Sequence, residues 1–145
     1  MSPTDKITLT AALISTTIST IVSIIVMYLS SRKQEKDALH TELFHINNLA
    51  IEYFYFEQDS FCNSCDGNRD NERSLRYDNY CCIVFNFLEK LYKHYFGNRK
   101  SIENFVGVRE LVIRHKTWWI LQGANRDHVE GYPLRFIDFI DTYLQ

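Results

Sequence analysis

The most prominent pattern in the chain is an uncharged stretch of twenty-three residues from Ile7 to Leu29. Fifteen of its residues are hydrophobic and the other eight are Ser or Thr. As a helix, this stretch would measure roughly 35 Å, which exceeds the ~30 Å thickness of the hydrocarbon core of a bilayer. The pattern therefore predicts one membrane-spanning helix, with residues 1–31 forming a transmembrane anchor.

Two alternatives to a membrane span stay open. A signal peptide has a basic start and an apolar stretch of about 7 to 15 residues, whereas this chain starts with MSPTDK and its apolar stretch is longer. The second alternative is a buried helix of a soluble domain, which the remaining residues would have to surround on all sides. Both alternatives fit the pattern less well than a span does.

Small side chains recur at every fourth position of the apolar stretch. We call these four residues the oligomerisation stripe: Ala11, Ser15, Ser19 and Ser23. Small residues let two membrane helices approach closely, so the stripe predicts self-association, or a polar lining exposed when several copies assemble. In the alternative interpretation, the Ser and Thr residues only fill space and bond to carbonyls of their own helix.

The distribution of Lys and Arg around the apolar stretch predicts its orientation. Lys6 precedes the stretch, whereas Arg32, Lys33 and Lys36 follow it. Because the side richer in Lys and Arg stays in the cytoplasm, we expect the N-terminus outside and residues 32–145 in the cytoplasm. For a bacterial protein, this location is the inner membrane.

Helical periodicity continues beyond the apolar stretch. Apolar residues recur at alternating steps of four and three, as on one face of a helix, at Leu39, Leu43, Ile46, Ala50 and Tyr53. No Pro or Gly separates them from the apolar stretch, so one helix from about Ile7 to about Glu57 is expected.

The rest of the chain predicts one loop and three more helices. The loop is the polar segment from Asp59 to Ser74, and the helices run over residues 77–96, 101–123 and 133–144. Gly97 is expected to stop the first of these helices, Ser101 to cap the second and Pro133 to begin the third. The fold class is therefore all-α, with residues 32–145 forming a small helical bundle.

The predicted bundle is nearly balanced in charge. Residues 32–145 contain seventeen acidic and fifteen basic residues, a net charge of about −2. This balance gives no strong electrostatic attraction to nucleic acid. The bilayer, a second copy of the chain or a protein partner is expected instead of RNA or DNA, although the balance does not exclude nucleic acid.

Four cysteines form the candidate metal site, namely Cys62, Cys65, Cys81 and Cys82. Four thiolates can bind zinc tetrahedrally. Neighbouring residues on a helix point about 100° apart, so Cys81 and Cys82 would not bind one ion unless the helix begins after them. No cofactor or metal is therefore expected, and a zinc-stabilised sensor stays the alternative.

Arg109 and His115 form an R-x5-H pair on a predicted helix. This spacing resembles the R-x4-6-H signature of HEPN-type helical ribonucleases. The resemblance implies that His115 would act on a ribose hydroxyl and Arg109 on phosphate in a dimer. A membrane-tethered ribonuclease is therefore an alternative function. In the other interpretation, the two residues belong to a solvated helix face and no residue is catalytic.

Two segments carry a further likeness. They are FNFLEKLYKHY from Phe85 to Tyr95, and Trp118–Trp119 together with EGYPLRFIDFI up to Ile140. In the order of its parts, the chain resembles small bacterial membrane proteins with one N-terminal span and a helical cytoplasmic domain. We therefore expect a non-enzymatic protein that self-associates or binds a protein partner. One concrete version is a membrane-perturbing effector of an antiviral or toxin-like system.

Overall fold

The computed structural model describes residues 3–64, 72–120, 129 and 131–145. All secondary structure in these residues is helical, which confirms the all-α prediction. The structure divides into two compact units, Met1–Ala38 and Leu39–Gln145. We call the second unit the domain. The predicted boundary between the membrane anchor and the helical bundle, after residue 31, depends on where the membrane lies. It therefore stays a prediction.

Helix α1 runs from Pro3 to Glu52. The prediction of one long helix is therefore confirmed, except that α1 ends about five residues earlier than expected. The chain then forms a 3-10 turn, η1 (Phe54–Glu57), which buries Phe56. Among the described residues, α1 is the one helix that is long and apolar enough to cross a membrane, and its most apolar part is exposed.

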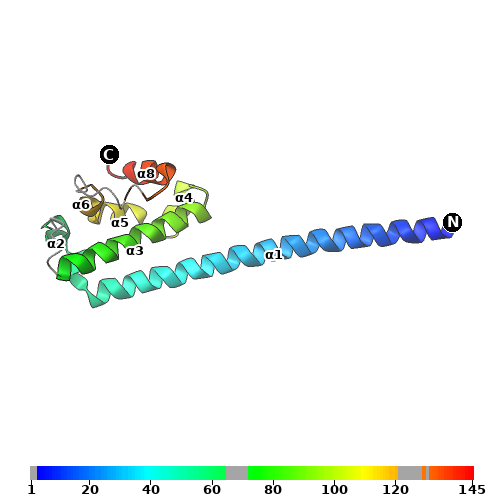
Figure 1. The fold of residues 1–145 in the computed structure, drawn as a ribbon, viewed down its shortest axis with the longest axis horizontal. Coiled ribbons are helices and arrows are strands. Elements are labelled where there is room, and N and C mark those ends of the chain that lie inside the picture. The colour runs from blue at the N-terminus through cyan, green and yellow to red at the C-terminus, as the bar shows by residue number, and fades with distance from the viewer. Residues whose placement is uncertain (1–2, 65–71, 121–128, 130) are drawn as a thin grey trace. The chain divides into compact units, whose positions relative to one another are not determined.

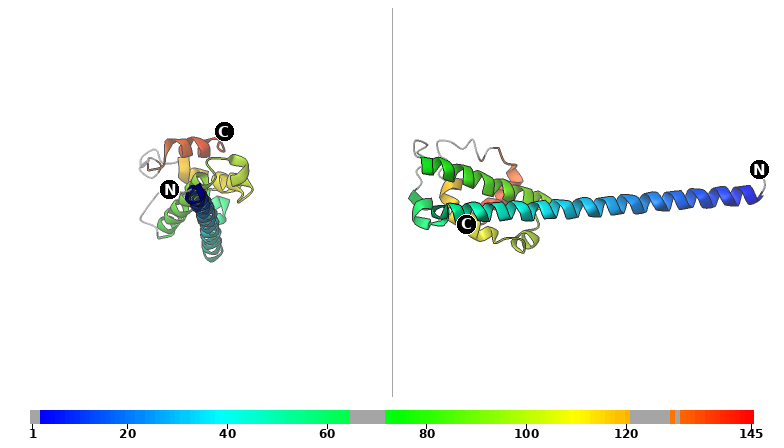
Figure 2. Two further views of the ribbon diagram at one scale, coloured as in Figure 1. Left: turned by 90° about the vertical axis from the view of Figure 1, so that its right-hand side faces the viewer. Right: turned by 90° about the horizontal axis from the view of Figure 1, so that it is seen from below.

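Six further helices lie in the described part of the domain: α2 (Asp59–Ser64), α3 (Glu72–His94), α4 (Arg99–Glu103), α5 (Val108–Arg114), α6 (Lys116–Ile120) and α8 (Leu134–Asp141). Within the domain, α3 runs beside the Leu39–Glu52 part of α1 (Figure 1). One hydrophobic cluster of the domain takes buried residues from these two helices and from α4, α5 and α8, among them Ile46, Leu88, Ile102, Val112 and Ile140. Figure 2 shows the domain from two further sides. The core therefore lies between α3 and the helices around it.

Aromatic side chains fill much of this core. Phe85 of α3 stacks on both tryptophans, with its ring centroid 5.2 Å from that of Trp118 and 4.5 Å from that of Trp119. The ring of Phe136 on α8 packs against Tyr92 of α3 at 5.7 Å. Burial of such rings is a large favourable term in folding, and it fixes the short helices on α3.

Several predicted helix ends are correct. Helix α3 ends at His94, and Gly97 follows in the left-handed region with φ of 73°. A Cβ on Gly97 would lie 2.9 Å from the Tyr92 ring, so glycine is needed there for space as well as for its φ. The sequence predicts Pro133 as the first residue of the last helix, and in the structure it is the N-cap residue just before α8.

Other predictions about the helices are wrong. The segment Asp59–Ser64, expected in a loop, forms α2, and α3 begins at Glu72 instead of Tyr77. The single helix expected over residues 101–123 is three helices up to Ile120, with breaks around Gly107 and His115. Asn98, and not Ser101, caps α4, because the Asn98 side chain accepts a hydrogen bond from the Ser101 backbone at 3.0 Å.

Candidate functional site

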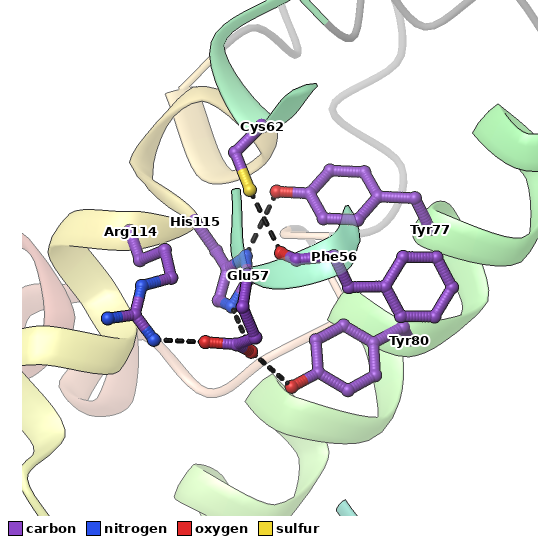
Figure 3. A network of polar contacts seen from close by, with 7 residues as sticks. All are labelled: Phe56, Glu57, Cys62, Tyr77, Tyr80, Arg114 and His115. Atoms are coloured by element: carbon purple, nitrogen blue, oxygen red, sulfur yellow. Dashed lines mark hydrogen bonds and ion pairs between the residues drawn. The ribbon is translucent and has the colours of Figure 1, made fainter. Parts of the chain in front are cut away.

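A network of polar contacts inside the domain surrounds Glu57, the last residue of η1 (Figure 3). The Tyr80 hydroxyl donates a hydrogen bond to Glu57 Oε1 at 2.7 Å. Arg114 Nη1 donates to Glu57 Oε2 and forms an ion pair with it. These contacts join η1 to α3 and to the end of α5. We call the following residues the Glu57 cluster: Glu57, Cys62, Tyr77, Tyr80, Arg114 and His115.

His115 lies at the C-terminal end of α5 and is completely buried. Its Nδ1 lies 2.9 Å from the Tyr77 hydroxyl, at hydrogen-bond distance. Its Nε2 lies 3.7 Å from Glu57 Oε1, too far for a hydrogen bond, and has no hydrogen-bond partner among the described residues. The ring is therefore held between α3 and η1 and does not reach solvent.

The surroundings of Glu57 favour its ionised form. The neighbouring His115 ring, and after it the Tyr80 hydroxyl and Arg114, lower the pKa of Glu57 to about 2, although burial acts in the opposite direction. Burial, and after it the bond to Glu57, raises the pKa of Tyr80, which therefore keeps its proton and donates. Burial likewise raises the pKa of Tyr77. At neutral pH, the cluster contains one carboxylate and one guanidinium in direct contact.

This arrangement connects segments that are distant in the sequence. Glu57 and Tyr80 are 23 residues apart, Tyr77 and His115 are 38 apart, and Glu57 and Arg114 are 57 apart. Glu57 and Arg114 are half-buried, and removing one of the two charges leaves the other without its partner, which costs free energy. The cluster therefore holds η1 against α3 and α5. Sequence reasoning missed Glu57, Tyr77, Tyr80 and Arg114 because no local pattern indicates pairs at such separations.

The candidate metal ligands are only partly described, since Cys65 lies outside the described residues. Cys62 and Cys81 are buried, Cys82 is half-buried, and Cys62 Sγ donates to the Phe56 carbonyl at 3.0 Å. Burial raises the pKa of the Cys62 and Cys81 thiols, which disfavours the thiolate that a metal requires. In the described part of the chain, no group of three or more His, Cys, Asp or Glu residues is placed to bind a metal.

The structure places Arg109 and His115 in different environments. Both belong to the α5 region, but Arg109 is exposed whereas His115 is completely buried and contacts Tyr77 and Glu57. The ribonuclease hypothesis stays a prediction. Its sharper test is Arg109→Ala, because substitution of His115 would also disturb the core.

The oligomerisation stripe lies on α1 in the other unit. Ser15, Ser19 and Ser23 are exposed, and the helix includes Ala11. Ser23 donates its hydroxyl to the Ser19 carbonyl at 2.9 Å. Thr16, Thr17 and Thr20 do the same to carbonyls one turn back, at 2.8 to 2.9 Å. These hydroxyls are thus satisfied within their own helix.

Comparisons with protein-family models, with curated proteins and with solved structures give no match to this chain. The function therefore has to be inferred from its own residues.

Proposed function

We propose that the chain is a membrane-anchored, non-enzymatic helical protein whose domain binds a second copy or a protein partner. The observation that supports the anchor is the exposure of large apolar side chains along α1. Ile21, Val26 and Leu29 are 52%, 59% and 60% exposed, and most large apolar residues between Leu13 and Leu29 resemble them. An apolar surface of this extent marks an interaction site, and a bilayer would cover it on all sides.

The hydrogen bonds of the hydroxyl groups support the same proposal. An unsatisfied polar group in lipid costs several kcal/mol. Thr16, Thr17, Thr20 and Ser23 avoid this cost because each donates to a carbonyl of α1. The helix can therefore enter a bilayer despite its many Ser and Thr residues.

The proposed orientation follows from the flanking charges. Arg32, Lys33 and Lys36 follow the span, whereas Lys6 precedes it. By the positive-inside rule, the domain is in the cytoplasm and the N-terminus is outside, in the inner membrane of a bacterium.

Extraction and reporter fusions test the anchor and its orientation. The full chain should stay in the membrane fraction after carbonate washing, and a reporter fused after Gln145 should be active only in the cytoplasm. A variant lacking residues 7–29 should lose membrane association. Release of the full chain by carbonate would contradict the anchor, and a periplasmic reporter would contradict the orientation.

We propose further that the oligomerisation stripe brings copies together within the membrane. Replacing Ser15, Ser19 and Ser23 with Leu would keep the helix apolar but prevent close approach. Thr10 and Thr17 lie on the other side of the helix by its 3.6-residue period, so their replacement with Leu is the matched control. Photobleaching steps of labelled chains in bilayers should fall to single steps only in the Ser variant. Equal step counts in both variants would contradict the stripe.

The most specific form of the proposal is a membrane-perturbing effector of an antiviral or toxin-like system. In this form, a partner's signal clusters the domains, and the hydroxyl-rich faces of the assembled spans disturb the bilayer. Dye leakage and single-channel recording test it with the inserted full chain. Silence in both assays after forced clustering would overturn the effector form and leave the anchor standing.

A further inference from the structure

A groove of about 430 Å³ opens on the domain beside the Glu57 cluster. This volume is in the range of small-molecule sites, ~300–1,000 Å³. Its walls are aliphatic side chains from α1, from the segment before α5 and from α5 itself: Leu43, Ile46, Ala50, Ile51, Val106 and Leu111. Ile51 is 77% exposed, so an apolar ligand in the groove would remove a large apolar side chain from water.

The polar lining of the groove consists of Asn47, Glu57, Tyr80 and Arg114. The Tyr80 hydroxyl donates to Glu57 Oε1, and Glu57 Oε2 accepts from Arg114, but Arg114 has further donors. Its contact with Glu57 uses Nη1, and Figure 3 shows its other terminal nitrogen pointing away from Glu57. The Arg114 side chain is 36% exposed, so these remaining donors can be reached from outside.

Spare guanidinium donors beside an aliphatic wall favour a ligand with a hydrogen-bond-accepting head and an apolar body. Arginine binds carboxylates especially well, because its planar fork matches their two oxygens. The spare groups of Arg114 are hydrogen-bond donors, which a cationic head without an acceptor cannot use. Glu57 is ionised and contacts Arg114, so it repels any anionic head, and it repels a doubly charged phosphate more than a singly charged carboxylate. A single carboxylate is therefore the head group that fits best.

We propose that this groove binds a free fatty acid, whose carboxylate accepts hydrogen bonds from Arg114 while its chain lies along Leu43, Ile46 and Ile51. Asn47 lines the same groove, and its side-chain amide is a further donor there. Every lining residue belongs to the domain, so the site does not depend on the proposed membrane anchor.

Photolabelling of the full-length protein in phosphatidylcholine nanodiscs tests this site. The probe is a palmitate analogue with a diazirine in mid-chain, and labelled peptides are located by mass spectrometry. We expect labelling within residues 43–51 and 106–114 that excess laurate suppresses but excess dodecanol or a lysophospholipid does not. Labelling within residues 7–29 reports probe dissolved in the bilayer and tests the proposed span separately.

Two variants separate the head-group contact from the apolar wall. Arg114→Gln should weaken labelling of the groove about tenfold, as expected for losing one charge-assisted hydrogen bond. Arg109→Gln, on the same helix but exposed and outside the groove lining, should leave it unchanged. Ala50→Leu places a larger side chain in the groove and keeps Arg114. We expect this variant to abolish labelling of the groove. Near-UV circular dichroism checks that each variant is folded.

Several results would overturn the proposal. These are absence of laurate-sensitive labelling in the groove, equal competition by dodecanol, or full labelling of folded Ala50→Leu. Stronger competition by the lysophospholipid would assign the groove to a phosphate head group and would also overturn it. If residues 43–51 and 106–114 are labelled but residues 7–29 are not, the result contradicts the membrane anchor and supports the fatty-acid site.

Discussion

The apolar part of α1 and the domain satisfy their polar side chains in opposite ways. In α1, Thr17 and Ser23 donate to carbonyls four residues back in the same helix. In the domain, Trp118 Nε1 donates to Asp78 at 2.7 Å across 40 residues of sequence, and Tyr77 bonds to His115 across 38. These polar groups of α1 are therefore satisfied locally, whereas the domain contains polar groups that depend on distant partners.

This difference determines how each region responds to substitution. A hydroxyl that bonds to its own helix can be lost without leaving a distant group unsatisfied, but the helix cannot accept a charge where lipid surrounds it. The domain, in contrast, contains polar groups that are satisfied only by one distant partner. Removal of that partner leaves a buried group unsatisfied, which costs ~1–3 kcal/mol.

The largest effect is expected for a charge in the middle of the apolar stretch. Ile21→Lys should cost roughly 3 kcal/mol of insertion free energy, since lysine at the centre of a membrane helix costs about that much. The fraction of protein retained after carbonate washing should fall strongly. The same substitution at Ile113, which is 40% exposed in the domain, is the control and should leave retention unchanged. Full retention of Ile21→Lys would contradict the span.

The second effect concerns the centre of the Glu57 cluster. Glu57→Gln removes the charge that Arg114 and Tyr80 contact, and we expect the free energy of unfolding of the domain to fall by about 2 kcal/mol. Thermal unfolding followed by near-UV circular dichroism measures this, at roughly 4–8 °C per kcal/mol. Glu110→Gln, exposed on α5, is the matched control.

Glu57→Gln should also change how the stability of the domain depends on pH. The pKa of Glu57 is lowered from its ordinary 4.5 to about 2 in the folded state. Its stabilising contribution is therefore complete above about pH 4.5 and is lost as pH falls from there towards 2. Glu57→Gln should lack this part of the acid dependence. Parallel melting temperatures of the two proteins between pH 6 and pH 3 would contradict the ionised contact.

A smaller effect is expected at the other side of His115. Tyr77→Phe removes the hydroxyl that bonds to Nδ1 and leaves a buried ring nitrogen without its partner, at a cost of ~1 kcal/mol. Tyr132→Phe provides the comparison, because the Tyr132 hydroxyl makes its bond to Asn86 at the surface and water can replace it. Chemical unfolding of both variants should separate them. Equal losses of unfolding free energy in the two variants would mean that the burial of His115 does not determine the effect of Tyr77→Phe.

The fold was predictable from the sequence wherever the determining signals are local. The uncharged stretch from Ile7 to Leu29, the glycine at position 97 and the proline at position 133 each act within a few residues. The first turn of α3 was missed because it has few apolar residues and is supported by an exposed Arg76–Glu72 ion pair at 2.5 Å. The breaks around Gly107 and His115 were missed because the apolar spacing continues through them.

The candidate site was much less predictable. His115 was selected for its spacing from Arg109, whereas its contacts are with Tyr77 and Glu57, on other elements. Cys62 was selected for its spacing from Cys65, but it packs into the core and donates to a carbonyl. Spacing in the sequence gives the neighbours of a side chain along one helix, and the Glu57 cluster consists of neighbours from four elements.

The smallest effect is expected for Thr17→Val in α1. The Thr17 hydroxyl donates to the Leu13 carbonyl at 2.8 Å, and this carbonyl is also within the helical backbone ladder. Valine has nearly the same shape and leaves no donor unsatisfied, so insertion should change by less than ~0.5 kcal/mol and towards stronger retention. Carbonate extraction of Thr17→Val and of Ile21→Lys in parallel compares the changes in membrane retention of the two variants. A clear loss of retention would mean that the Thr17 hydroxyl bonds to a group outside its own helix. Thr17 would then depend on a distant partner, as the polar groups of the domain do.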